Sequence, residues 1–312
     1  MKSEIKRIAA ENLADLTGFA AADTFDRNDP IFQIFPEVKT VIGLAFRVLR
    51  GCYRGTEEGT TYYQYTTMGV ENMEETVMPM AQLRIANYIE SKGFTALPQR
   101  RHQQIMREKN STNPEVAYDA IYRDKPAEIQ MNFPDAAVRC GLGEKGLSGA
   151  LLTDDFGPMV RYCFVLTDAV LAPDERKPPH LCDGCGACIK ACPGKAISPT
   201  GELDPWQCAV YYNGANGTKN PFMPPDAFRD FENRMEIIAG EAGVTPETAR
   251  DILDHIYFYP PAQHAYQCSI CGRACDTECY IQLERRGVLK KSFHHPFRER
   301  EPWRFDLSDF KQ

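Results

Sequence analysis

The stretch that decides the fold of this chain is Cys182-x-x-Cys185-x-x-Cys188-x-x-x-Cys192-Pro193. Three closely spaced cysteines, followed by a fourth just before a proline, form the run that bacterial two-cluster ferredoxins use. In those proteins the first three thiolates hold one [4Fe–4S] cluster, and the fourth belongs to the other cluster. The run therefore predicts a second set of cysteines elsewhere in the chain.

That second set is present downstream as Cys268-x-x-Cys271-x-x-x-Cys275, and Cys208 stands alone between the two runs. One cluster is expected to be held by Cys182, Cys185, Cys188 and Cys275. The other is expected to be held by Cys192, Cys208, Cys268 and Cys271. This crossed ligation would join the two runs and make the region between them an insertion. The role of Cys279 is left open, because it lies close to Cys275 and could act as a ligand in its place.

Zinc and disulfide bonds are the alternatives for so many cysteines. A structural zinc site needs only two Cys-x-x-Cys pairs, and this chain has twelve cysteines. Disulfide bonds require an oxidising compartment, which nothing in the sequence indicates. The thiols outside the runs, Cys52, Cys140 and Cys163, are expected to be small core residues.

The composition describes an ordinary globular protein. The 312 residues are 43% hydrophobic and 25% charged, which is enough to bury a full core. A formal charge of −7 argues against a general nucleic-acid coat. Mean hydropathy is −0.42, and the lack of a long apolar run predicts no transmembrane helix. Residues 1–7 lead into an amphipathic helix and not an apolar signal region, so a cytoplasmic location is expected.

Periodicity predicts an α+β protein. Helical spacing predicts helices over residues 3–16, 71–92, 134–139, 226–240 and 245–257. Apolar runs predict strands over 40–46 and 160–167 and an extended segment over 147–153. Cys208 is expected on a turn. The expected domains are residues 1–175, residues 176–282 with a helical insertion over 222–258, and a tail, 283–312, that packs back on the body.

Gly141, Gly143 and Gly146 match the pattern G-x-G-x-x-G. A dinucleotide site requires a strand before these glycines and a helix after them. The predicted order is the reverse, so a dinucleotide site is disfavoured. Four glycines within residues 141–149 still indicate that the backbone passes close to a neighbouring element or to a bound cofactor.

Two other segments leave alternatives open. The tyrosines of residues 53–69 suit either a packed aromatic segment or the wall of a pocket for a large planar ligand. The basic tail suits a solvated face, a docking surface for a partner or nucleic acid, or a cover over negatively charged clusters. We favour the cover, because aromatic residues that need burial interleave its charges: Phe293, Phe297 and Trp303.

Several motifs occur together in a characteristic order: Gly141-Leu142-Gly143-Glu144-x-Gly146, Leu151-Leu152-Thr153-x-x-Phe156-Gly157-Pro158, Thr167-Asp168, Leu203-Asp204-x-x-x-Cys208 and the two cysteine runs. This combination resembles the epoxyqueuosine reductase and reductive dehalogenase superfamily. The resemblance covers residues 130–280 well and the N-terminal part weakly.

The resemblance implies a nitroreductase-like α/β sandwich domain beside a ferredoxin-like domain with two [4Fe–4S] clusters. It also implies a base-off corrinoid (cobalamin) that receives electrons from the clusters and reduces an epoxide or a carbon–halogen bond. The residues it places near the corrin are Gly141, Gly143, Gly146, Ser148, Gly149, Arg161 and Thr167. The proton donor is not assigned; Glu128 and Asp135 are weak candidates, and Asp135 also suits a helix N-terminus.

The resemblance further implies partners, and it leaves an alternative cofactor and an alternative function open. Reduced ferredoxin or flavodoxin would be the electron donor, and no membrane association is expected. A tRNA substrate is not excluded, although the C-terminal region that holds tRNA in epoxyqueuosine reductases is expected to be absent. FMN could replace the corrinoid, since nitroreductase-like folds bind it. Alternatively, the chain is an electron-transfer protein that reactivates a corrinoid partner and has no substrate of its own.

Overall fold

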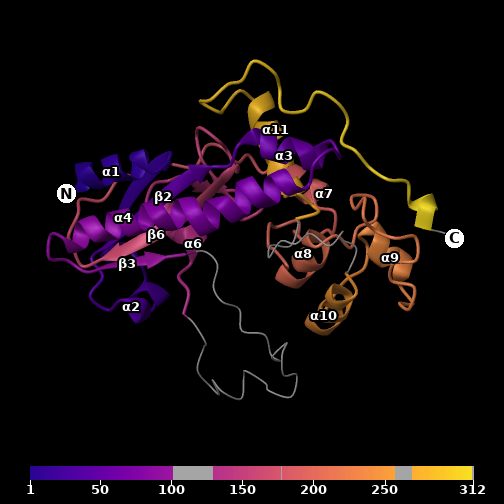
Figure 1. Cartoon of the computed structure of the whole chain (residues 1–312), viewed down its shortest axis with the longest axis horizontal. Helices are drawn as coiled ribbons and strands as arrows, with labels where there is room; N and C mark the ends of the chain where they lie inside the picture. The colour runs from indigo at the N-terminus through magenta and orange to yellow at the C-terminus, as the bar shows by residue number, and fades with distance from the viewer. Residues whose placement is uncertain (101–128, 177, 257–268, 311–312) are drawn as a thin grey trace. The chain divides into compact units, whose positions relative to one another are not determined.

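The computed structural model describes residues 1–100, 129–176, 178–256 and 269–310, and it is a mixed helix and sheet structure (Figure 1). The chain forms two compact units. Unit 1 consists of Met1–Phe46, Thr76–Leu142 and Tyr162–Arg176. Unit 2 consists of Arg47–Glu75, Gly143–Arg161 and Lys177–Gln312. Residues 47–75 and 143–161 thus cluster with the cysteine region, although the sequence grouped them with the N-terminal domain.

Unit 1 is built around a four-stranded sheet in the order β1-β2-β6-β3. Its strands are β1 (Leu16–Ala21), β2 (Thr40–Arg47), β3 (Ala96–Gln99) and β6 (Val160–Thr167). β1 runs antiparallel to β2, and β3 runs antiparallel to β6. Every residue of β6 is buried, which is typical of a strand covered on both faces. The predicted strands over 40–46 and 160–167 are therefore confirmed.

Helices cover this sheet. They are α1 (Lys2–Glu11), α2 (Pro30–Ile34), α4 (Met78–Glu90) and α6 (Phe133–Arg139), with a 3₁₀ turn, η1, at Ala22–Thr24. Figure 1 shows α4 lying along the sheet, where it packs against β3 and α1. The amide of Gln82 on α4 donates to the carbonyls of Gln99 (2.8 Å) and Phe164 (2.7 Å), so the helix is bonded to two strands.

The predicted helices of unit 1 need two corrections. The first helix ends at Glu11 and not at residue 16, because Leu13 adopts a left-handed backbone with φ 68°. The expected helix over 71–92 is α4 preceded by two π-helical segments, η2 (Gln64–Glu71) and η3 (Met73–Val77). Pro79 lies in the first turn of α4, where its missing N–H costs nothing. The helix predicted over 134–139 is confirmed as α6.

Unit 2 contains the cysteine runs and is mostly helical. Its helices are α3 (Arg50–Glu57), α7 (Ala187–Ala191), α8 (Pro205–Tyr212), α9 (Arg234–Ala239), α10 (Pro246–Asp254) and α11 (Ala274–Arg285), with a 3₁₀ turn, η4, at Leu307–Phe310. A two-stranded ribbon pairs β4 (Glu144–Lys145) with β5 (Leu151–Leu152). α7 packs along α11, and α8 packs against α10.

Three sequence predictions in unit 2 change. The helix expected over 226–240 is only α9, because the chain from 226 to 233 forms turns. Cys208 lies inside α8 and not on a turn; Asp204 caps this helix by accepting hydrogen bonds from the N–H groups of Trp206 and Gln207. The extended segment expected over 147–153 is shorter, since only Leu151 and Leu152 pair in the ribbon.

The tyrosine-rich segment is packed. Tyr53, Tyr62 and Tyr65 are 2%, 6% and 1% exposed. Tyr53 and Tyr65 have ring centroids 4.8 Å apart and share a core cluster with Ile281 of α11. The packed interpretation of this segment is confirmed for these three residues.

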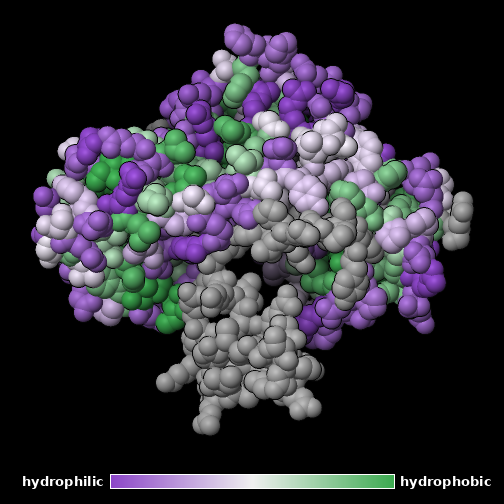
Figure 2. Space-filling model, in the orientation of Figure 1, coloured by the Kyte–Doolittle hydropathy of each residue, from purple (hydrophilic) through white to green (hydrophobic). Residues whose placement is uncertain are grey.

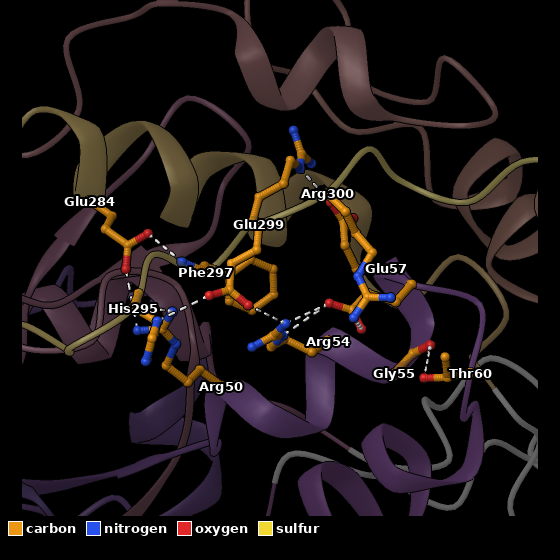
Figure 3. A network of polar contacts seen from close by, with 12 residues as sticks. Arg50, Arg54, Gly55, Glu57, Thr60, Glu284, His295, Phe297, Glu299 and Arg300 are labelled. Atoms are coloured by element: carbon orange, nitrogen blue, oxygen red, sulfur yellow. Dashed lines mark hydrogen bonds and ion pairs between the residues drawn. The ribbon is translucent and has the colours of Figure 1, made fainter.

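The tail is held to unit 2 by one buried ring and several ion pairs. Phe297 is 1% exposed, and its N–H donates to Glu284 at 2.7 Å. Arg50 pairs with Glu284 at 3.3 Å, and its guanidinium donates to the carbonyl of His295 at 3.1 Å. Figure 3 shows these three residues close together. Arg298 pairs with Glu57 and Glu278. These basic residues of the tail meet carboxylates. Arg286, also in the tail, lines a pocket that contains cysteine thiols, and the predicted cover over the clusters stays a prediction.

Hydrophilic side chains of the described residues predominate on the face drawn in Figure 2, and hydrophobic ones form separate patches. Such a surface is usual for a globular protein. Within the described part of the chain, no helix combines the length and apolar character needed to cross a bilayer.

Candidate metal centre

Four thiols of unit 2 line one pocket: Cys182, Cys185, Cys188 and Cys279. The pocket is closed by the apolar side chains of Leu147, Leu181 and Leu283. Burial raises the pKa of the Cys279 thiol, and the charges of Asp276 and of the other three cysteines raise it further. These four thiols line the same pocket and influence one another electrostatically. We call them the first thiol group.

The backbone of the first cysteine run makes two left-handed turns, and its first three thiols line this pocket. Gly184 and Gly186 adopt left-handed φ angles of 73° and 69°, which side chains with a Cβ disfavour. Gly186 is also the residue that precedes α7, so Cys188 lies in the first turn of that helix. The left-handed backbone at these two positions therefore explains why glycine occupies them.

A buried carboxylate holds the start of the run. Glu144 is 5% exposed and accepts three backbone hydrogen bonds: from His180 (2.5 Å) and Leu181 (3.0 Å) at Oε2, and from Cys182 (2.7 Å) at Oε1. This one side chain satisfies the buried N–H of Leu181 and the partly buried N–H groups on either side of it. Glu144 positions the loop that carries the first cysteine.

The glycine motif also serves this loop. Gly143 lies so close to β5 that a Cβ there would be 2.1 Å from the carbonyl oxygen of Leu152. This close approach lets the backbone turn, and the N–H of Leu147 then points at the Sγ of Cys182 at 3.3 Å. Ser148 lines the same pocket. Hydrogen bonds from backbone N–H groups to cysteine sulfur tune the reduction potential of iron–sulfur clusters.

A second thiol group consists of Cys192, Cys208, Cys271 and Cys275. Burial raises the pKa of Cys271 to about 11, with further contributions from Cys208 and Cys192. Burial also raises the pKa of Cys275, which Asp276, Cys271 and Cys192 raise further. The N–H of Ala196 donates to the Sγ of Cys192 at 3.3 Å. These contributions to pKa link the four thiols electrostatically, and we treat them as one group.

The placement of two thiols differs from the predicted pairing. Cys279, and not Cys275, lies with the first three cysteines, while Cys275 lies with Cys192 and Cys271. Both residues are on α11, one turn apart, so the helix forms a wall of both groups. Cys268, which the sequence assigned to the second group, lies outside the described residues.

Charged and phenolic groups are buried in unit 2 near the second group. Arg273 pairs with Asp276 at 2.7 Å and influences the pKa of Cys275. Arg161, one of the residues assigned by resemblance, donates to Glu74 at 3.0 Å and to the hydroxyl of Tyr65 at 2.7 Å. Burial disfavours the charge of Arg161, but Tyr65 and Glu74 outweigh it, so its pKa is raised.

The other residues assigned by resemblance are engaged within the protein. In unit 1, Thr167 is fully buried and its hydroxyl donates to the carbonyl of Thr95 at 2.8 Å. A Cβ at Gly141 would be 3.0 Å from the carbonyl oxygen of Glu175. Gly146 approaches Leu152 in the same way in unit 2, while Gly149 has more room. The assignment of these residues to a corrin stays a prediction of the resemblance.

Of the two candidate proton donors, only Asp135 lies within the described residues. Asp135 is in the first turn of α6 and pairs with Arg139 at 2.5 Å, as a carboxylate that complements the helix dipole would. Glu128 lies outside the described residues. The core prediction for lone cysteines is confirmed, since Cys52, Cys140 and Cys163 are buried.

The thiols present fit iron–sulfur clusters. All eleven described cysteines are free, and two groups of four are partly to fully enclosed by protein. Within the described residues no three His, Cys, Asp or Glu side chains converge on a point suited to one metal ion. The case for a cluster therefore depends on the thiol groups and on the Cys-rich run, whose residue types and spacing are those of [4Fe–4S] ligands.

In a comparison with known protein families, residues 177–198 match the 4Fe-4S binding domain. The chain therefore contains a domain of that class. Its homologues are named reductive dehalogenases and epoxyqueuosine reductases, both of which are oxidoreductases, and the predicted resemblance is confirmed. The tetrachloroethene reductive dehalogenase of Dehalobacter restrictus is 42% identical over 83 residues, which are 25% of this chain and 15% of that protein.

An epoxyqueuosine reductase of Bacillus cereus is 32% identical over 104 residues, which are 32% of this chain and 26% of that protein. The matches thus span 15% and 26% of these two relatives. Among solved structures, epoxyqueuosine reductase from Streptococcus thermophilus aligns over 86% of this chain and 67% of its own, with 15% identity and a TM-score of 0.45. A reductive dehalogenase aligns over 92% of this chain and 37% of its own, with 14% identity and a TM-score of 0.46. Likenesses at this level support neither fold nor function.

Proposed function

We propose that the chain is an iron–sulfur reductase that carries two [4Fe–4S] clusters and delivers their electrons to a corrinoid. The first cluster would be held by Cys182, Cys185, Cys188 and Cys279. The second would be held by Cys192, Cys208, Cys271 and Cys275. The observation that carries the proposal is the sorting of eight thiols of unit 2 into two groups with α11 as a common wall.

The roles of the chain's own residues follow from their contacts. Glu144 holds the first cysteine loop in place, and the N–H groups of Leu147 and Ala196 each donate to one cluster sulfur. Such donors make a cluster easier to reduce, because they stabilise the added negative charge. The raised pKa values of the cysteines mean that loading a cluster releases protons from these thiols.

The reaction class comes from the homologues. A bound corrinoid would supply the reduction of an epoxide or a carbon–halogen bond, which is difficult chemistry that no side chain can perform. The protein would supply electrons one at a time from a donor such as reduced ferredoxin or flavodoxin. The substrate would be a small molecule or a modified nucleoside, as in the two groups of named relatives.

Anaerobic cofactor analysis of the full chain tests the proposal. The protein should bind about eight iron and about eight sulfide per chain after reconstitution. Added cobalamin should give the electron paramagnetic resonance signal of base-off Co(II) when the clusters are reduced. Iron for one cluster, or zinc, would reject the two-cluster part. Two clusters without any corrinoid binding would support the electron-transfer protein instead.

A further inference from the structure

A second pocket of unit 2 contains no cysteine and is not used by the proposed function. It is a cavity of about 490 Å³ between the start of α3, the turn before β6, α11 and the tail. Its lining residues are Arg47, Val48, Leu49, Arg50, Gly51, Asp155, Phe156, Met159, Tyr280, Lys291, Ser292 and Phe293. A cavity of this volume suits a small organic molecule.

The floor of the pocket is apolar and preformed. Val48, Met159 and Tyr280 are 3%, 1% and 2% exposed and belong to one core cluster. The N–H of Val48 donates to the carbonyl of Met159 at 2.8 Å, so two sides of the floor are bonded to each other. A ligand would meet a fixed apolar surface there, with the ring of Tyr280 as part of it.

The tail wall of the pocket is pinned at both ends. On one side, the ammonium of Lys290 pairs with the Asp154 carboxylate at 2.7 Å. The backbone N–H of Lys290 also donates to the backbone carbonyl of Asp154 at 2.8 Å. On the other side, Arg50 donates to the carbonyl of His295 (Figure 3). The segment 291–293 between these anchors carries Phe293, whose ring centroid is 4.1 Å from the guanidinium of Arg50.

The rim of the pocket is positively charged. The guanidinium of Arg47 and the ammonium of Lys291 lie 5.9 Å and 6.0 Å from the ring centroid of Phe156. Arg50 is paired with Glu284 at 3.3 Å, whereas Lys291 makes no ion pair with any described residue. One acid, Asp155, lines the pocket against these cations. An excess of positive charge around an aromatic wall selects a negatively charged ligand with a flat apolar body.

We propose that this pocket binds a planar aromatic anion, with the ring between Phe156 and Phe293 and the acidic group at Lys291 and Arg47. The site is independent of the proposed function, because none of its lining residues is a thiol ligand. Its floor residue Tyr280 follows Cys279 on α11, so a ligand bound there would lie on the helix that carries a cluster ligand.

Anaerobic calorimetric titration of the iron–sulfur-loaded full chain tests this proposal with 2-naphthoate and, as the uncharged ligand of similar size, 2-naphthalenemethanol. We expect saturable binding of naphthoate that weakens with added salt and at least about fivefold weaker binding of the alcohol. Lys291→Gln should weaken naphthoate binding about fivefold or more, and Phe156→Ala should weaken both ligands.

Arg300→Gln is the matched control. Arg300 is an exposed tail cation that pairs with Glu58 at 3.4 Å and does not line the pocket, so naphthoate binding should be unchanged. No saturable binding, equal binding of the two ligands, or equal effects of the Lys291 and Arg300 variants would overturn the proposal. Iron content, measured on the same samples, reports separately on the clusters.

Discussion

The Oε1 atom of Glu144 accepts a hydrogen bond of 2.7 Å from the backbone N–H of Cys182, and its other oxygen accepts two more from the residues before it. A side chain of the glycine motif therefore fixes the backbone from which the first cysteine extends. Because the carboxylate is buried, its loss leaves donors without partners. The first cluster should depend on Glu144 although Glu144 is not a ligand.

We expect Glu144→Ala to lower the iron content toward half, because each buried donor left without a partner costs about 1–3 kcal/mol. Glu144→Gln keeps one acceptor oxygen and should retain more iron. It also removes a negative charge, so the first cluster should have a less negative reduction potential, measured by titration followed by electron paramagnetic resonance. Glu241→Gln, on an exposed pair with Lys195, is the control. Unchanged iron and potential in both Glu144 variants would contradict the positioning role.

Replacing each of the two α11 cysteines in turn should damage a different cluster. Cys279→Ser is expected to damage the cluster of Cys182, Cys185 and Cys188, and Cys275→Ser is expected to damage the other. Each variant should lose about half of its iron, with different paramagnetic signals remaining. Cys52→Ala, at a buried thiol outside both groups, should keep all of it. Loss of the same signal in both variants would show that the two cysteines serve one cluster.

The cysteine pattern shows both what a sequence can predict and where prediction stops. Spacing in the first run is a local property, so it predicted the thiols that lie together there. The choice between Cys275 and Cys279 is not local, because both project from α11 one turn apart and packing of α7 on that helix decides which thiol meets which run. The i, i+4 spacing of the two cysteines was the available signal.

The glycine motif was interpreted through family resemblance and not through its contacts. Its four glycines correctly indicated a close backbone approach, which is to Leu152 at Gly143. The role of Glu144 was missed, because its backbone partners lie more than thirty residues away and no side-chain pattern marks them. Strand β6 was predictable, since six of its eight residues are apolar or aromatic and such a segment suits a strand buried on both faces.

The tail should contribute to stability through one ring. Phe297 is 1% exposed and contacts Tyr280 with ring centroids 5.7 Å apart, so Phe297→Ala should lower the free energy of unfolding by about 3–5 kcal/mol. Phe293→Ala, at a ring 53% exposed, should cost about 1 kcal/mol. Urea denaturation of the iron-loaded chain measures both changes. Equal small effects would mean that the tail is not part of the folded core.

Alkaline pH should destabilise the cluster-free protein. Burial raises the pKa of Cys271 from its usual 9.0 to about 11, so the folded state favours the neutral thiol. That stabilisation is complete below the unfolded pKa and is lost as pH rises through the folded pKa. The urea midpoint of unfolding should therefore decrease as pH rises from about 9 to about 11. The decrease should be smaller in Cys271→Ala. A midpoint that rises over this range would contradict the direction of the shift.

The buried pair of Arg161 and Glu74 should be the most sensitive ion pair of unit 2. Their side chains are 9% and 2% exposed, so Arg161→Gln leaves a carboxylate buried without its cation and should cost about 3–5 kcal/mol of unfolding free energy. The double replacement Arg161→Met with Glu74→Leu should recover much of the lost free energy of unfolding, because no buried charge is then left without its partner. Arg7→Gln, at an exposed pair with Glu4, should have no measurable effect. If the double variant is no more stable than Arg161→Gln, the cost arises from lost packing around Tyr65 and not from the stranded charge.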